Sequence, residues 1–335
     1  AIEILTELGY DYVFGPDISP EGLNPERKSY DEVVLVDRLR SSIDELNPNL
    51  PNDAKEDAVK KVLRVITPTQ IATNELFHNM LVNGVDVEYR NQEGRIVGTK
   101  VWLIDFNKPD NNRFLAVNQF SVIEQNCSRR PDIVLFINGL PLVLIELKNP
   151  ADEEATVKTA YDQIQTYKAE IPSLLKYNEL ILASDGSYAK AGSLTSPWEW
   201  MLPWKTIDGE DKAPDAVPQL EVVLQGMCNK KVLIDLIQNF TVFENEEKGT
   251  KKKIAAYHQY YAVNKAVLST LKASSPAGDK RCGVVWHTQG SGKSLSMVFF
   301  TGKIVLSMNN PTIVVLTDRN DLDDQLFGKI GRAHV

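Results

Sequence analysis

The stretch that decides the fold is "PDIVLFINGLPLVLIELKNP", residues 131–150, in which two apolar runs flank Asn138-Gly139. An Asn-Gly pair between two strand-forming segments favours a tight two-residue turn. The stretch therefore predicts an apolar β-hairpin, and its few charged residues need a separate explanation.

Those charged residues are Asp132, Glu146 and Lys148. Side chains two apart on a strand share a face, and the hairpin returns Asp132 beside the other two. Burying two carboxylates costs several kcal/mol unless something compensates them, and a divalent cation does so. Mg²⁺ on Asp132 and Glu146 would neutralise a scissile phosphate and lower the pKa of bound water, while Lys148 positions the nucleophile or stabilises charge. This pattern favours phosphodiester hydrolysis; the alternative is an exposed Asp132 and a surface Glu146–Lys148 salt bridge.

The helical spacing after the hairpin adds two polar candidates. Gln163 and Tyr167 are four residues apart, so they lie on one helix face and could reach the same phosphate or orient the lysine. Glu75, among apolar neighbours on an earlier predicted helix, could supply a further carboxylate to the metal. Its alternative is a solvated helix edge.

A second motif, "HTQGSGKS", follows the apolar run 283–286 and precedes a helix-like run, 295–307. Strand, glycine loop and helix form the context of a phosphate-binding loop. The glycines of Gly290-Ser291-Gly292 let backbone N–H groups converge on phosphate oxygens, Lys293 neutralises charge, and the Ser294 hydroxyl can hold Mg²⁺. His287 stands where the usual pattern has its first glycine, and the alternative is a chance Gly-Ser turn before a lysine.

Two further segments belong with this loop. Gln259 lies upstream, and its carboxamide can read both a donor and an acceptor on the edge of adenine. Downstream, residues 312–317 read as a strand that ends in Thr317, Asp318 and Arg319, at the end of a parallel strand where such sheets bind ligands.

Composition limits the class of protein. The 335 residues carry a net charge of −8, which is the wrong sign for a protein whose whole surface binds DNA, so any nucleic-acid contact must be local. The dense basic run "KGTKKK", residues 248–253, favours a solvated linker over a binding patch. Neither a membrane span nor a signal peptide is expected, which predicts a cytoplasmic protein. Cys127, Cys228 and Cys282 are scattered and indicate neither a disulfide framework nor a zinc site.

The motifs, taken in order, resemble the restriction subunit of type I restriction-modification enzymes. The segments that carry the resemblance are "PDIVLFINGLPLVLIELKNP", "QIQTY", "YHQYYAVNKAV", "HTQGSGKS" and "VVLTDRNDLDDQL". The resemblance implies an α/β fold: a PD-(D/E)xK endonuclease-like mixed sheet flanked by helices, followed by the beginning of a RecA-like P-loop domain. It implies Asp132, Glu146 and Lys148 as the nuclease core, with Gln163 and Tyr167 as a Q-x-x-x-Y motif.

For the second half, the resemblance implies a superfamily 2 DNA translocase. Gln259 becomes its adenine-reading motif, residues 290–294 its motif I, and Thr317, Asp318 and Arg319 its motif Ia with DNA contacts. The implied cofactors are Mg²⁺ and ATP. The implied partners are double-stranded DNA and the modification (methyltransferase) and specificity subunits of a type I complex.

The expected domains are a nuclease domain over residues 1–244, a linker over 245–256 and the start of the first RecA-like domain over 257–329. No acidic "DEA" motif follows Leu326, so this chain is expected to be a fragment whose motor is incomplete. Residues 330–335, "IGRAHV", back-translate to a common sequencing adapter and are expected to be an artefact. The start at Ala1 suggests a missing beginning as well.

The leading hypothesis is an ATP-dependent type I site-specific endodeoxyribonuclease subunit. Two alternatives remain open at this point. One is a stand-alone helicase-nuclease fusion, and the other is a nucleotide-gated binding module with an inactive nuclease domain.

Overall fold

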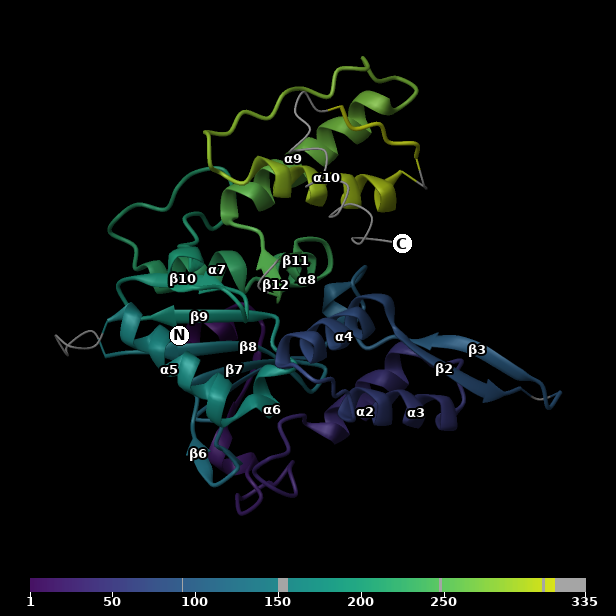
Figure 1. The fold of residues 1–335 in the computed structure, drawn as a ribbon, viewed down its shortest axis with the longest axis vertical. Helices are drawn as coiled ribbons and strands as arrows, with labels where there is room; N and C mark the ends of the chain where they lie inside the picture. The colour runs from purple at the N-terminus through teal and green to yellow at the C-terminus, as the bar shows by residue number, and fades with distance from the viewer. Residues whose placement is uncertain (92, 150–155, 247–248, 309–310, 317–335) are drawn as a thin grey trace. The chain divides into compact units, whose positions relative to one another are not determined.

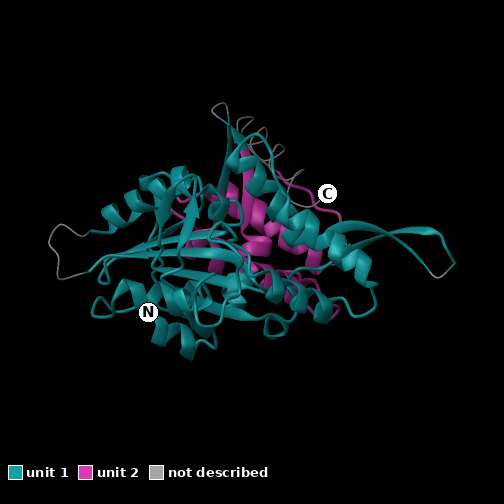
Figure 2. Ribbon diagram, turned by 90° about the horizontal axis from the view of Figure 1, so that it is seen from below, with its two compact units in different colours: residues 1–234, 245–252 teal, residues 235–244, 253–335 magenta. Residues whose placement is uncertain are grey.

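The computed structural model describes residues 1–91, 93–149, 156–246, 249–308 and 311–316. The chain divides into two compact units, which Figure 2 shows in different colours. Unit 1 comprises residues 1–234 and 245–252, and unit 2 comprises residues 235–244 and 253–335.

Unit 1 is built around a six-stranded mixed sheet with the order β1-β4-β7-β8-β9-β10 (Figure 1). The β1–β4 and β8–β9 pairs are parallel, and the other three pairs are antiparallel. The expected mixed sheet flanked by helices is therefore confirmed. Its strands are β1 (Asp11–Phe14), β4 (Phe114–Asn118), β7 (Ile133–Ile137), β8 (Leu140–Leu147), β9 (Leu180–Ser184) and β10 (Ala189–Gly192).

The predicted hairpin forms the centre of this sheet as β7 and β8. Ile137 pairs with Leu140, which leaves Asn138 and Gly139 as a two-residue turn with φ of 54° and 82°. Both values are positive, as a type I′ turn requires, and a Cβ on Gly139 would lie 2.5 Å from the Leu35 carbonyl oxygen. Every residue of β7 is buried, and so are the first seven of β8. The positions of the polar residues on this hairpin are therefore set by two strands that lie in the core.

Helices and smaller hairpins complete unit 1. The helix α5 (Val157–Glu170) packs on β8 and β9, and the hairpin of β2 (Val85–Arg90) and β3 (Ile96–Val101) projects away from the sheet (Figure 1). The remaining elements are α1 (Ile2–Glu7), α2 (Val36–Leu46), α3 (Asn52–Leu63), α4 (Gln70–Asn83), β5 (Val122–Glu124), β6 (Cys127–Arg129), α6 (Pro172–Leu175), α7 (Gln219–Met227), α8 (Lys230–Asn239), and the 3₁₀ turns η1 (Gly15–Ile18), η2 (Pro109–Asn111) and η3 (Trp198–Trp200).

The segment expected to be a solvated linker is instead ordered as the hairpin of β11 (Thr241–Glu246) and β12 (Gly249–Ile254). The side chain of Lys252 is fully buried in unit 1, where its Nζ lies 2.6 Å from Glu179 Oε2 and 2.8 Å from the Asn178 carbonyl oxygen. Lys252 Nζ also donates to Asn74 Oδ1, and Glu179 Oε2 lies 2.9 Å from His78 Nδ1. We call these five residues the Lys252 cluster. The compact units divide the chain differently from the expected domains 1–244, 245–256 and 257–329, because residues 235–244 group with unit 2 and residues 245–252 group with unit 1.

Unit 2 contains two long helices, α9 (Tyr257–Ser274) and α10 (Lys293–Ser307). The ammonium of Lys303 lies 2.7 and 2.8 Å from the two carboxylate oxygens of Asp235 and 2.6 Å from Asn264 Oδ1. Phe240 packs on the rings of Tyr260 and Phe299. These contacts hold α9 and α10 together with the end of α8.

The two strands expected in unit 2 are not formed in the described residues. Residues 283–286 and 311–316 have no strand pairing, and Val284, Trp286 and Leu316 are 88–91% exposed. A parallel strand gains its hydrogen bonds and its cover only from neighbouring strands and helices, and the described part of unit 2 provides no sheet for these runs to join. Residues 317–335, which include the suspected artefact, lie outside the described residues.

Candidate active site

Asp132 and Glu146 face each other across the β7–β8 hairpin. Ile133 pairs with Ile145, so one further step along the register places Asp132 opposite Glu146. Residues directly opposite each other in an antiparallel pair have Cβ atoms about 4.5–5.5 Å apart on the same face of the sheet. The alternation predicted from the sequence therefore brings the two carboxylates together.

Lys148, Gln163 and Tyr167 join these carboxylates in one hydrogen-bonded network. Lys148 Nζ lies 3.2 Å from Glu146 Oε1 and also donates to Gln163 Oε1. Gln163 Nε2 donates to the Tyr167 hydroxyl at 2.6 Å, and that hydroxyl donates to Glu146 Oε2 at 3.1 Å. The helix α5 thus contributes two residues, one helical turn apart, that hydrogen-bond to the side chains of Lys148 and Glu146.

Gln119 is a member of this network that the sequence did not indicate. Its Nε2 donates to Asp132 Oδ1 at 3.2 Å, and its backbone N–H donates to the Asp132 carbonyl oxygen at 2.9 Å. Gln119 has a φ of 55°, which is uncommon for a residue other than glycine. The backbone N–H of Leu147 donates to Asp132 Oδ2 at 2.8 Å, so both oxygens of this carboxylate are oriented by neighbours.

The electrostatics of the network leave Glu146 poorly compensated. Glu146 is 1% exposed, and burial together with the nearby Asp132 raises the pKa of its carboxyl to about 7, although Lys148 and Tyr167 act in the opposite direction. Burial and Glu146 also raise the pKa of the Tyr167 hydroxyl, so this group stays a neutral donor. The pair of carboxylates therefore carries a negative charge that its protein neighbours only partly neutralise.

This arrangement fits a small divalent cation. Carboxylate oxygens are the ligands that Mg²⁺ prefers, and it is usually held by one or two carboxylates with water in the other positions. Among the described residues no group of three or more His, Cys, Asp or Glu side chains is spaced to hold a metal, so the candidate ligands among these side chains are the pair Asp132 and Glu146.

Glu75 is not brought to this pair. It lies half-buried on α4, whose neighbouring Asn74 donates to the carbonyl oxygens of Lys176 and Asn178 before β9 begins. The Asp132–Glu146 pair lies beside Ala183, near the opposite end of β9. Glu75 forms no hydrogen bond to either carboxylate in the part of the chain that the structure describes.

The phosphate-loop candidates lie together in unit 2. Gly292, with a φ of 78°, caps the start of α10, so Lys293 and Ser294 occupy the first turn of that helix. Lys293 Nζ lies 3.0 and 2.9 Å from the carbonyl oxygens of His287 and Thr288, which closes the loop on itself. Gly290 has a φ of 81°, and Ser291 follows it, with its carbonyl oxygen 3.1 Å from His258 Nε2.

Gln259 lies against this loop. Its Nε2 donates to the Gly292 carbonyl oxygen at 3.0 Å, and its Oε1 accepts from the Ala256 backbone N–H at 2.9 Å. Both ends of the carboxamide thus form a hydrogen bond within the protein, and each end has the capacity for a second one. Thr317, Asp318 and Arg319, the expected DNA contacts, lie outside the described residues.

In the described part of the chain, every helix is too short or too polar to cross a bilayer.

Comparison with known proteins matches both halves of the chain. The family "Type I restriction enzyme R protein N terminus" matches residues 1–200, and the family "SWI2/SNF2 ATPase" matches residues 258–334. The endonuclease subunit of the type I restriction enzyme HindI from Haemophilus influenzae is 44% identical, over 97% of this chain and 31% of that protein. A protein from Methanocaldococcus jannaschii, assigned to the enzyme MjaIXP, is 34% identical, over 98% of this chain and 33% of its own length.

This chain spans about a third of the length of these relatives. The match of unit 1 covers the β7–β8 hairpin and α5, and the second match covers Gln259 and the glycine loop. The chain belongs to the family of type I restriction enzyme R proteins.

Proposed function

We propose that unit 1 is a Mg²⁺-dependent DNA endonuclease and that unit 2 begins an ATP-driven DNA translocase. In a complete subunit, the two would cleave unmodified double-stranded DNA together with modification and specificity subunits. The observation that carries this proposal is the network of Asp132, Glu146, Lys148, Gln163 and Tyr167. It joins two facing carboxylates to a half-buried lysine at the end of an apolar hairpin.

Asp132 and Glu146 would hold Mg²⁺, which supplies a metal-bound water of lowered pKa and neutralises charge on the phosphate. The protein's own groups do the positioning. Gln119 and the Leu147 N–H fix the rotation of the Asp132 carboxylate, and the Tyr167 hydroxyl fixes that of Glu146. Lys148, held between Glu146 and Gln163, places a cation where negative charge develops on the phosphoryl oxygens.

The test is nicking of supercoiled plasmid DNA by residues 1–335 with Mg²⁺ and without ATP. We expect Lys148→Ala to lower the rate by about 10²- to 10³-fold, the usual cost of removing one electrostatic donor. Lys108→Ala, which alters an exposed lysine outside the network, is the matched control and should nick at the wild-type rate. Equal nicking by wild type and Lys148→Ala would refute the nuclease assignment and favour a binding module.

A further inference from the structure

The row of residues that contains Asp132 and Glu146 continues across the sheet to a lysine that the proposed reaction does not use. Glu146 pairs with Ala183 on β9, and Ala183 pairs with Lys190 on β10. Residues in one such row project from the same face, and neighbouring strands are about 4.8 Å apart. Lys190 therefore lies on the catalytic face, with its backbone about 10 Å from that of Glu146.

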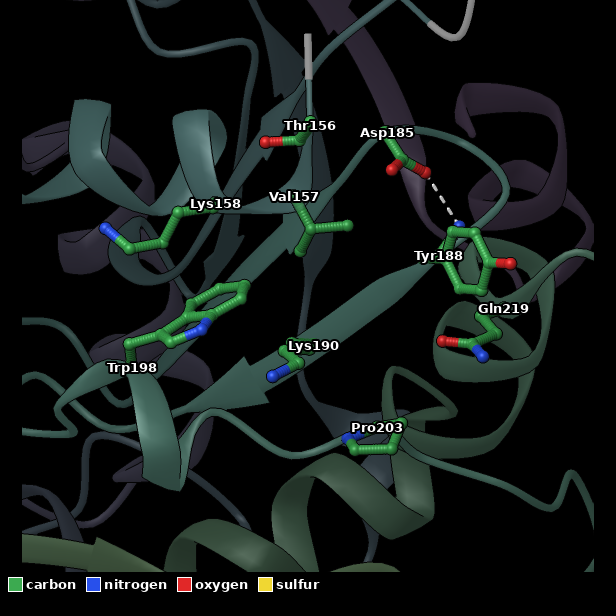
Figure 3. Close-up of a pocket in the computed structure, with 9 residues that line it drawn as sticks. All are labelled: Thr156, Val157, Lys158, Asp185, Tyr188, Lys190, Trp198, Pro203 and Gln219. Carbon is green, nitrogen blue, oxygen red and sulfur yellow. Dashed lines mark hydrogen bonds between the residues drawn. The ribbon is translucent and has the colours of Figure 1, made fainter. Parts of the chain in front are cut away.

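Lys190 borders a pocket of about 370 Å³ beside the first turn of α5 (Figure 3). Trp198 and Tyr188 lie on opposite sides of this pocket, with Val157 and Lys190 between them, as Figure 3 shows. Val157 is six residues before Gln163 on α5, a rise of about 9 Å along the helix. The pocket thus lies about 10 Å from the network when measured across the sheet, and about 9 Å from it when measured along α5.

The charges around the pocket single out Lys190. Its Nζ lies 3.9 Å from the centre of a Trp198 ring, and it has no carboxylate partner among the described residues. Lys158 is ion-paired with Asp162, and the Asp185 carboxylate accepts the Tyr188 backbone N–H at 2.7 Å. A lysine held over an aromatic face keeps its N–H groups available to a phosphate oxygen.

The aromatic walls suit a nucleotide. Tyr188 is 63% exposed although it is large and apolar, and the Gln219 side chain beside it donates to no protein group in the described residues, while its Oε1 accepts the Ala189 N–H at 3.1 Å. Trp198 is half-buried between Lys190 and Tyr161. An exposed aromatic ring near a lysine is a usual means of holding a nucleic-acid strand without reading its sequence.

We propose that this pocket is a second DNA-strand subsite of the nuclease unit. In it, Lys190 contacts a backbone phosphate, and Trp198 and Tyr188 flank the attached nucleotide. Because the backbones of Lys190 and Glu146 are about 10 Å apart on one face, this phosphate would lie close to the scissile phosphate on the same strand. The subsite rests on the proposed function, because it aligns the strand for the same reaction. It also lets a protein of net charge −8 hold DNA locally.

The experiment measures DNA affinity against salt concentration in residues 1–335 carrying Lys148→Ala, in EDTA so that the proposed Mg²⁺-dependent cleavage does not occur. Each phosphate contact contributes about one to the slope of log K against log salt. We expect Lys190→Gln to reduce that slope by about one, whereas Lys190→Arg keeps it. Lys100→Gln, a half-exposed lysine on β3 away from the pocket, should leave the slope unchanged. Trp198→Leu should weaken DNA binding, because Lys190 loses the aromatic ring over which its ammonium group lies.

In the cleaving protein, Lys190→Gln should raise KM for plasmid severalfold with little change in kcat. A slope and a KM that both match wild type in a folded Lys190→Gln protein would overturn the subsite. Should that variant fail to fold, Tyr188→Ala replaces it, since this exposed ring can be removed at little cost to the core. Failure of the proposed function looks different: wild type would not nick DNA with Mg²⁺, whereas the salt slope would still report whether Lys190 contacts DNA.

Discussion

Glu146 combines a function with a cost to stability that can be measured. Its pKa in the folded chain, about 7, is above the value near 4.3 expected in the unfolded chain, so the folded state binds this proton more tightly. The stability that the raised pKa contributes is complete below pH 4.3 and is lost as the pH rises through 7. The folded state therefore loses stability at neutral pH, where the buried carboxylate ionises.

The raised pKa of Glu146 leads to a prediction for Glu146→Gln, in which the new side chain cannot ionise. Compared with wild type in EDTA, the variant should gain about 2–4 kcal/mol in free energy of unfolding between pH 5 and pH 8, while losing nicking activity. Urea titrations at the two pH values measure the gain. A pH-independent difference between the two proteins would show that Glu146 is not perturbed by burial.

In the proposed reaction, Tyr167 and Gln163 would position Glu146 and Lys148. Tyr167→Phe removes the donor to Glu146 Oε2 and leaves the buried ring in place. We expect nicking to fall by roughly tenfold, with the Mg²⁺ concentration for half-maximal rate raised, because an outer hydrogen bond to a metal ligand commonly contributes 10- to 100-fold. A normal Mg²⁺ dependence would mean that Tyr167 only packs.

The residues of this network differ in how far the sequence predicts them. Asp132, Glu146 and Lys148 follow from strand alternation and one tight turn, and Gln163 and Tyr167 follow from helical spacing. Gln119 could not be predicted in this way, since it reaches Asp132 from the end of a neighbouring strand whose register is set by tertiary pairing. The same holds for Lys190, which shares the row of Glu146 only through the pairing of β8, β9 and β10. Local sequence patterns identify site residues within one hairpin or helix. They do not identify residues that become neighbours only when separate strands pair in the sheet.

Among the elements, β12 differs most from its expected role. Its basic run reads as solvated, yet Lys252 is buried while its neighbour Lys251 pairs with Glu246 at the surface. The difference depends on Glu179, which lies 73 residues earlier and offers the buried partner. Burial alone would raise the pKa of the Glu179 carboxyl, but Lys252 and His78 hold it below its ordinary value.

The Lys252 cluster makes a matched prediction possible. Lys252→Met leaves Glu179 with one cationic partner fewer in the core, so we expect it to cost about 3–5 kcal/mol of unfolding free energy. Lys251→Met, the adjacent surface lysine, should cost less than about 1 kcal/mol. Adding Glu179→Gln to Lys252→Met should recover most of the loss. Urea unfolding of the four proteins tests this, and equal costs for the two single lysine variants would contradict the buried pairing.

In the described part of unit 2, the two expected strands did not form and the expected helix did. The runs 283–286 and 312–317 have strand composition, but strand composition becomes a strand only beside partners. The helix after the glycine loop was predicted correctly because its hydrogen bonds are internal, and α10 forms at Lys293–Ser307. Whether a segment pairs into a sheet depends on residues elsewhere in the chain, and the sequence of that segment alone does not show whether they are present.

For the molecule as a whole, the two units are expected to differ in stability. Unit 2 exposes apolar side chains at residues 284–286 and 314–316, whereas unit 1 buries the central strands β7, β8 and β9 of its sheet. Limited proteolysis should therefore leave a resistant core from unit 1 whose end lies near residue 254, because Lys252 is part of that core. Mass spectrometry of the core gives its boundary. A stable fragment ending before residue 245 would show that the Lys252 cluster is dispensable.

The same chain is expected to bind adenine nucleotide weakly and not to hydrolyse it. Gln259 and residues 290–294 provide one wall of a site, and phosphoryl transfer needs several convergent groups. Residues 1–335 should show no DNA-stimulated release of phosphate, and Lys293→Ala should not change that result. Sustained DNA-dependent hydrolysis by this chain would show that the groups present are sufficient.

The division of the chain has a consequence for how the units can be separated. The chain passes between units at residues 234–235, 244–245 and 252–253, and the first passage lies inside the continuous helix α8. The other two passages lie inside β11 and β12, so a cut at any of the three points breaks a helix or a strand. Neither unit can therefore be produced intact as one uninterrupted segment of the chain.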